Sequence, residues 1–190
     1  MANSIDFRYD KEAVEKRVKA YIENTELSPL PDDDSLEMSN IGTAKFINVL
    51  CLSGGRLAKT ESQKRFMVFL AERNQNFRGL GVVGFDIVEM PWAKDSFEED
   101  KEFMLGVIDG VKNKLGWETL DYEPNEEVIF AYMDKFRKLI DRMSVDDIDE
   151  ENLTEWLSHA DADDPVNCGF PKCEKHDAYI SVFGCQVCTD

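Results

Sequence analysis

The chain has 190 residues, of which 39 are acidic and 22 are basic, and its formal net charge is -17 at pH 7. A negative field of this size repels phosphate backbones, which excludes DNA and RNA as expected ligands and favours a protein partner with a basic surface. Hydrophobic residues make up 43% of the chain. At this length folding buries roughly 70% of the unfolded surface, so a core without disulfides is expected.

The cellular setting follows from what the sequence does not contain. No stretch approaches the roughly 18 consecutive apolar residues of a membrane span. The opening residues, MANSIDFRYDKEAVEKR, show no apolar run of the kind found in a secretory signal peptide. We therefore expect a cytoplasmic protein without membrane contact, in which clustered cysteines are metal ligands rather than disulfides.

The first part of the chain predicts two helices joined by a surface loop. Apolar residues at helical spacing predict an amphipathic helix over 10–24, and the proline-containing, acidic stretch 23–40 predicts a loop. The nearly continuous apolar run 43–55 fits a strand or a buried helix. We favour a helix, capped by Ser39 or Asn40 and ending at Gly54, with Cys51 packed in the core.

Three further segments follow in chain order. Thr60 and Gln63 stand at the spacing of a capping box before an amphipathic helix. The valine-rich segment 80–90 predicts a strand. Ser96 and Glu99 form a second box before an apolar helical stripe that Gly116 ends.

The last helices precede a change in composition. Asn125 begins the most regular amphipathic pattern of the chain, and a short acidic helix carries Trp156. The DADDP sequence that follows marks a boundary. These elements predict a mainly α fold, α+β with a minor strand component: an acidic helical domain over 1–160 and a cysteine-rich module over 161–190.

The C-terminal module carries the strongest chemical signal. Its spacing is Cys168-x4-Cys173-x2-His176-x8-Cys185-x2-Cys188, and the segment AYISVF between the pairs predicts a connecting strand. Zinc binds four such ligands tetrahedrally. Zinc is favoured over an iron–sulfur cluster, disulfides or free thiols. The simplest ligand set is the four cysteines; the alternative replaces one of them, most simply Cys168, with His176.

The predicted zinc site is structural rather than catalytic. A catalytic zinc keeps one position open for water, whereas this segment offers at least four ligands, mostly thiolates and close in sequence. A segment of this size buries too little surface to fold without the ion. We therefore expect a zinc-knuckle module.

Other motifs fail on their context. Residues 79–84 read G-x-G-x-x-G, but a dinucleotide site needs a strand before this motif and a helix beginning within it. Here a polar helix end precedes the motif and a strand is predicted after it. A phosphate loop would need glycine at Ser53 and Ala58, so Lys59 and Thr60 are interpreted as a helix cap. The acidic runs lack the glycine of a calcium loop.

Catalytic groups are few. His159 lies at the end of a predicted helix, where its charge suits the dipole. The segment 116–127 presents an aromatic and acidic group, but nothing in the sequence selects one acid pair for acid–base chemistry. Its members are Trp117, Glu118, Asp121, Tyr122 and Glu123.

The functional expectation is a non-enzymatic, zinc-stabilised acidic binding protein that acts on a basic protein partner, such as an inhibitor or immunity-type protein. The alternative is an enzyme that uses carboxylates of the helical domain. A deep pocket holding an acid with a raised pKa would favour the enzyme, and a flat acidic face with exposed aromatic residues would favour the binding protein.

Overall fold

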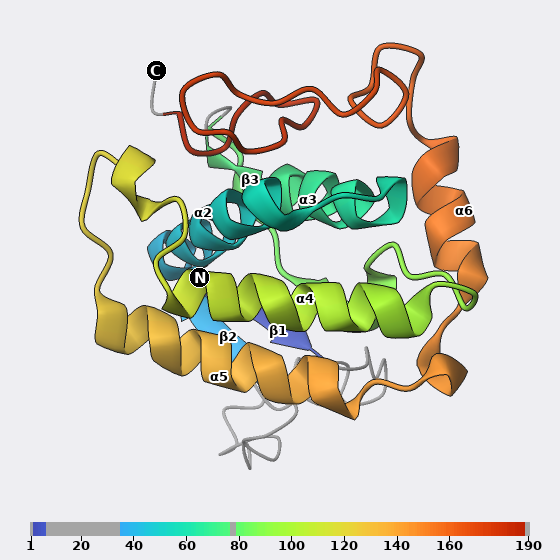
Figure 1. Cartoon of the computed structure of the whole chain (residues 1–190), viewed down its shortest axis with the longest axis horizontal. Helices are drawn as coiled ribbons and strands as arrows, with labels where there is room; N and C mark the ends of the chain where they lie inside the picture. Colours follow the sequence, from blue (N-terminus) through green and yellow to red (C-terminus); the bar gives the residue numbers. More distant parts are fainter. Residues whose placement is uncertain (1, 7–34, 77–78, 189–190) are drawn as a thin grey trace, which may run out of the picture.

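The computed structural model describes residues 2–6, 35–76 and 79–188, which form a mainly helical protein with a few short strands (Figure 1). The helices in these ranges are α2 (Asn40–Leu57), α3 (Glu61–Arg73), α4 (Phe97–Lys112), α5 (Glu126–Arg142) and α6 (Glu150–Ser158). The strands are β1 (Ala2–Asp6), β2 (Ser35–Ser39), β3 (Asn74–Gln75), β4 (Gly81–Val82) and β5 (Phe85–Asp86). None of the described helices is both long and apolar enough to cross a membrane. The predicted helix over 10–24 lies outside the described residues.

Helix α2 is the centre of the fold. Every residue from Phe46 to Gly55 is buried, because α3 and α4 pack on it and the C-terminal segment (residues 161–188) covers it from another side. A helix that is buried on all sides has a nearly continuous apolar sequence, which a buried strand can also have. The sequence of α2 is therefore compatible with either element. The helix prediction is confirmed, and Ser39 caps the helix by accepting from the Gly42 N–H. The helix continues past the predicted end at Gly54 to Leu57.

Helices α4 and α5 form an antiparallel pair on one side of α2 (Figure 1). The predicted cap of α5 is confirmed, since the Asn125 side chain accepts from the Val128 N–H. Its apolar face reaches the central helix, where Phe136 meets Phe46 edge to face at 5.3 Å between ring centres. The amphipathic pattern of α5 therefore directs this helix onto the core as predicted.

A small sheet covers the other end of α2 and corrects one expectation. Strand β1 pairs antiparallel with β2, with Ile5 opposite Leu36, and parallel with β5. The sequence predicts a surface loop over residues 23–40, but residues 35–39 form a strand. In this strand Leu36 and Met38 alternate with exposed positions and enter the core. A half-buried strand of five residues gives too short an alternation to stand out beside an acidic loop.

The strand predicted over 80–90 is wrong in its extent. Only residues 81–82 and 85–86 are extended, and a 3-10 turn follows over Ile87–Glu89. The Asp86 side chain accepts from the Val88 N–H, and the Glu89 side chain accepts from the Asp86 N–H. These local hydrogen bonds compete with strand pairing and turn the chain.

The two predicted capping boxes have different outcomes. The box at Thr60 and Gln63 is present at the start of α3. The box at Ser96 is absent: the Ser96 hydroxyl donates instead to the carboxylate of Asp100 at 2.7 Å, as does Ser62 at 2.6 Å. Asp100 is buried, so these hydroxyls satisfy an otherwise unpaired acid and are not free to cap the helix.

The C-terminal segment lies over α2 and α3 (Figure 1). Phe170, Ala178, Tyr179 and Val187 are buried within the same apolar core as the helices. The predicted strand AYISVF is not formed as a regular element: this stretch takes part in isolated bridges, Lys172 with Tyr179 and Ser181 with Gly184. The division into two domains near residue 160 stays a prediction.

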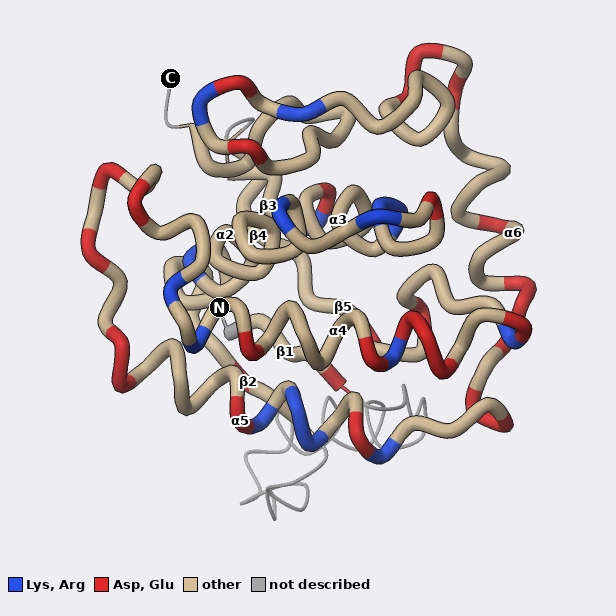
Figure 2. The backbone as a smooth tube through the Cα atoms, in the orientation of Figure 1, with Lys and Arg blue, Asp and Glu red and all other residues tan. Residues whose placement is uncertain are grey.

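Acidic residues outnumber basic residues in the chain, and Figure 2 shows where both occur along the described backbone. Acidic positions are frequent on the connection between α4 and α5 and around α6 and the loop that follows it. Helix α5 carries both basic and acidic positions. In the described residues the acidic positions are therefore spread over several elements and are not confined to one segment.

Candidate metal centre

Four ligand side chains of the C-terminal segment converge on one point. Their ligand atoms all lie within 4.8 Å of one another. The imidazole Nδ1 of His176 is 3.5 Å from the sulfur of Cys173, 3.5 Å from that of Cys185 and 3.4 Å from that of Cys188. The sulfurs of Cys173 and Cys188 are 3.8 Å apart, and all four cysteines of the segment are unbonded to one another.

These distances match the edges of a tetrahedron around a metal ion. With sulfur at about 2.3 Å and nitrogen at about 2.0–2.1 Å from zinc, two sulfurs lie about 3.8 Å apart and sulfur and nitrogen about 3.6 Å apart. The observed sulfur–sulfur and sulfur–nitrogen distances agree with both values. The four ligand atoms, all within 4.8 Å of one another, therefore surround a space of the size that a four-coordinate ion requires.

Backbone N–H groups around the site also favour metal-bound sulfur. Burial acts to raise the pKa of Cys173, but hydrogen bonds from the backbone of His176 and Lys175 outweigh it and lower that pKa below its ordinary value. For Cys185, burial dominates and raises the pKa to about 12, against hydrogen bonds from the backbone of Val187 and Cys188. Each x2 pair thus wraps its N–H groups around the first sulfur, an arrangement that stabilises a thiolate once an ion offsets the burial.

Cys168 lies outside this group. Its side chain is exposed, and its thiol donates to the carbonyl oxygen of Ala162 at 3.5 Å. The chain between Cys168 and Cys173 includes Phe170, whose φ of 59° is left-handed, and Pro171. The four ligand atoms that the structure gathers are thus those of the alternative set, with His176 in the place of Cys168. Gly169 and Gly184, beside Cys168 and Cys185, both have positive φ, a backbone conformation that glycine adopts readily.

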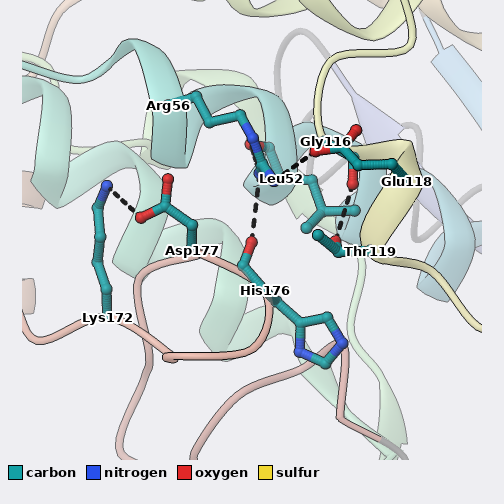
Figure 3. A network of polar contacts seen from close by, with 8 residues as sticks. All are labelled: Leu52, Arg56, Gly116, Glu118, Thr119, Lys172, His176 and Asp177. Carbon is teal, nitrogen blue, oxygen red and sulfur yellow. Dashed lines mark hydrogen bonds and ion pairs between the residues drawn. The ribbon is translucent and has the colours of Figure 1, made fainter.

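The metal centre is attached to the C-terminal end of α2 by two cations (Figure 3). Arg56 donates to the carbonyl oxygen of His176 at 3.2 Å and pairs with Glu118 at 3.0 Å. Lys172 donates to the carbonyl oxygen of Gly55 at 2.6 Å and pairs with Asp177 at 2.9 Å. Cations at a helix C-terminus are favourable, because the last carbonyl groups lack helical partners.

Close packing at Gly55 fixes the same contact. A Cβ at this position would lie 2.4 Å from the carbonyl oxygen of Asp177 and 3.1 Å from Cα of Ala178. Both are backbone atoms, so a larger residue would displace the loop that carries His176. The glycine of α2 therefore sets how near the metal centre approaches the helix.

The dinucleotide-like glycine motif has the backbone context expected of a turn. Residues 81–82 pair with β3 and residues 85–86 with β1, so no helix begins within the described part of the motif. At Gly84 a Cβ would lie 2.2 Å from the carbonyl oxygen of Ser4. Gly84 therefore allows the chain to pack closely against β1.

The other candidate residues mostly brace helices. Trp117 packs on Phe130 with 6.1 Å between ring centres, and the ammonium of Lys45 lies 4.9 Å from the centre of the Tyr122 ring. His159 ends α6, and its Nδ1 lies 2.8 Å from the carbonyl oxygen of Glu155.

The structure also reveals a cavity that the sequence did not suggest. It has a volume of about 570 Å³ and lies between the end of α3, α6, the loop after α6 and the turn at Val182 and Phe183. Glu72 lines it and accepts from the indole N–H of Trp156 at 2.9 Å. Burial, with a smaller contribution from the negative charge of Asp164, raises the pKa of Glu72 to about 7. In sequence Glu72 is one acid in an amphipathic helix, and its indole partner lies on another helix.

The structure gathers three thiols and one imidazole into a group that could hold a metal ion. Glu118, one of the acids that the sequence suggested for catalysis, forms an ion pair with Arg56 of α2. The acid that lines the cavity is Glu72 of α3, which the sequence did not suggest as a site residue. The chain matches no known family model, no curated protein sequence and no solved structure.

Proposed function

We propose that the chain is a zinc-stabilised acidic binding protein whose partner is a protein with a basic surface. The observation that carries the proposal is the cluster of Cys173, His176, Cys185 and Cys188, in which the three sulfur–nitrogen distances and the Cys173–Cys188 sulfur distance match the edges of a tetrahedron around zinc. Three thiolates and one imidazole form a ligand set that suits zinc. With four protein ligands no position is left for a substrate water, so the zinc is structural and the C-terminal segment is a zinc-knuckle module.

Zinc accounts for the folding of a segment with little regular secondary structure. A structural zinc contributes on the order of 10–16 kcal/mol to the folding of a small module at neutral pH. That contribution holds the loop of His176 and Asp177 against the end of α2, where Arg56 and Lys172 anchor it. The zinc thereby supports the surface that the segment shares with the helices.

The partner class rests on charge. A net charge of -17, with acidic positions spread over several elements of the described residues, repels nucleic acids and accelerates encounters with a basic protein. An inhibitor or immunity-type protein that covers a basic active site is one role of this kind. Such a protein imitates the charge of a nucleic acid with exposed carboxylates, and this chain has 39 acidic residues.

The metal test uses elemental analysis of purified protein with a matched pair of cysteine variants. The wild-type chain is expected to contain one zinc per chain. Cys185→Ser removes a ligand and should lose most of the zinc, whereas Cys168→Ser removes an exposed thiol outside the group and should retain it. Wild-type protein without zinc, or equal loss in both variants, would contradict the assignment.

The partner test is affinity capture from the native host with the zinc-loaded chain, followed by mass spectrometry at two salt concentrations. Basic proteins that dissociate as salt rises are expected, because contacts between exposed charges are screened over about 8–10 Å at physiological salt. Capture of acidic proteins, or capture that salt does not weaken, would refute the charge argument.

A second candidate function has one specific observation in its favour. Glu72 lies in a cavity and has a pKa raised to about 7, which suits a general acid or base near neutral pH. Among the residues that the structure describes, the side chains that line the cavity include no serine, threonine, cysteine or lysine that could serve as a covalent nucleophile. Turnover of a substrate that disappears in Glu72→Gln would favour the enzyme over the binding protein.

A further inference from the structure

We propose that the cavity beside Trp156 binds a cationic nitrogen group, an ammonium or a guanidinium. This inference rests on the proposed function, because it names the site at which a basic partner or ligand would insert a side chain or amine. Hereafter the acidic cavity means the space of about 570 Å³ lined by Glu72, Trp156, His159, Asp161, Asp163 and Asp164, with Arg73 and Phe183 completing its walls.

The acids of the cavity are held in place by their own loop. The Asp164 carboxylate accepts from the Val166 N–H at 3.0 Å, and the Asn167 side chain donates to the carbonyl oxygens of Ala160 and Asp161 at 3.3 and 2.8 Å. Such a loop loses little conformational entropy when a ligand binds. The loop backbone and the Asp164 carboxylate are thus preorganised beside a space large enough for an alkyl ammonium or a guanidinium.

Aromatic and apolar walls accompany the charge. Trp156 and Phe183 line the same space as the acids, together with Val166 and Val182. Cations are attracted to aromatic faces, most strongly to that of tryptophan, and their alkyl stems pack on apolar surface. An acidic patch that was merely solvated would not need a cavity with this mixture of walls.

The one guanidinium among the described residues of the wall offsets only part of the acidic charge. Arg73 lies over the ring of Phe69 at 4.1 Å, and the charges that act on it are those of Glu89, outside the cavity lining, and more weakly of Glu72. Four carboxylates of the described lining therefore face the space against one guanidinium, which is shared with Glu89. The cavity remains short of positive charge.

The state of Glu72 agrees with a missing cation. Its carboxylate is faced by the indole of Trp156 from α6, by Asp164 from the loop and by Arg73 from its own helix, and burial raises its pKa to about 7. A cation placed in the cavity would favour the ionised carboxylate and lower that pKa. Ligand binding is then accompanied by proton release near neutral pH.

The test follows the indole N–H resonance of Trp156 by NMR in the full zinc-loaded chain, assigned with Trp156→Phe. The probes are spermidine, a hexa-arginine peptide and the same peptide with citrulline in place of arginine. Glu72→Gln keeps an acceptor for the indole N–H, and Asp161→Asn with Asp163→Asn removes two exposed charges. The matched control, Asp95→Asn with Glu98→Gln, removes two exposed charges on α4 and before it.

We expect spermidine or the arginine peptide to shift this resonance to saturation and the citrulline peptide not to do so. Affinity should fall about tenfold or more in Glu72→Gln and in the double variant, as expected for loss of a charge-assisted contact, and less than about twofold in the control. Binding of spermidine would identify a free amine as a sufficient ligand. Binding of the arginine peptide alone would identify a partner side chain.

The opposite results are distinct. Equal affinity for the citrulline peptide, equal losses in the control, or no shift with any probe would overturn the cation site. If no probe shifts the resonance while the chain contains zinc and captures a basic partner, only the cavity assignment fails. If the probes bind but no basic partner is captured, the proposed function fails and the cavity assignment stands.

Discussion

Replacement of Glu72 by glutamine gives the sharpest test of the electrostatics of the cavity. The carboxylate has a pKa near 4.5 in the unfolded chain and about 7 in the folded chain, because burial disfavours its ionised form. Glutamine is similar in shape, carries no charge and can accept the hydrogen bond that Trp156 donates at 2.9 Å. The variant therefore removes the partly buried charge and keeps the packing.

The magnitude follows from linkage between protonation and folding. Between the two pKa values the folded chain binds more protons than the unfolded chain, so the stability of the wild type falls as pH rises through this window. Below the window the acid is neutral in both states and costs nothing. The advantage of Glu72→Gln in the free energy of unfolding should grow from about 1.4 kcal/mol at about pH 5.5 to about 3 kcal/mol at about pH 8.

Urea unfolding of zinc-loaded wild type and Glu72→Gln, followed by far-UV circular dichroism across this pH range, measures the difference. Glu98→Gln, which removes an exposed carboxylate on α4, is the control and should change stability by less than about 0.5 kcal/mol. A Glu72→Gln difference that is flat with pH, or that favours the wild type at about pH 8, would refute the assignment of a partly buried carboxylate whose ionised form is disfavoured.

Three further predictions concern packing, metal and nucleotide binding. Gly55→Ala should lower the free energy of unfolding by about 1–3 kcal/mol, because its Cβ would collide with the backbone of Asp177 and Ala178. It should also displace the loop that carries His176, which faster amide exchange at Ala178 would measure. Gly106→Ala, whose Cβ meets nothing within 4 Å, should instead stabilise α4 by about 0.5–1 kcal/mol. Chelation should remove amide protection in the C-terminal segment while most helical ellipticity survives; loss of both signals at one chelator concentration would contradict the division near residue 160. NAD and FAD should leave the melting temperature unchanged, since Gly84 packs on Ser4, and a saturable increase would contradict this.

Local patterns in the sequence predict several helix caps and the group of five candidate metal ligands. The cap at Asn125 and the capping box at Thr60 are satisfied within a few residues of chain, so their sequence patterns suffice to predict them. The soft ligands crowded near the C-terminus are likewise a local signal. Where a distant partner intervened, local reasoning failed: Ser96 does not cap α4, because its hydroxyl joins Ser62 in satisfying buried Asp100.

The choice among five candidate ligands needed the folded chain. The x2 spacing that joins Cys173 to His176 equals the spacing of Cys185 and Cys188, and a turn of this length brings both ligands and the intervening N–H groups to one ion. Cys168 is separated by x4 and by the left-handed backbone of Phe170, and it ends on the surface. The equal x2 spacing favours His176 as a ligand, whereas the larger number of cysteines favours the set of four cysteines.

The sheet and the acidic cavity were decided by tertiary structure alone. Strand β5 has two residues, too few for a periodic pattern. Its register comes from pairing with β1, which lies about 80 residues earlier in the chain. Glu72 and Trp156 are far apart in sequence, and each has an ordinary place on its own amphipathic helix. Periodicity specifies which face of a helix is buried, but the environment of one side chain on that face is set by the element packed against it. The raised pKa of Glu72 therefore depends on α6 and the loop after it, which partly cover this side chain of α3.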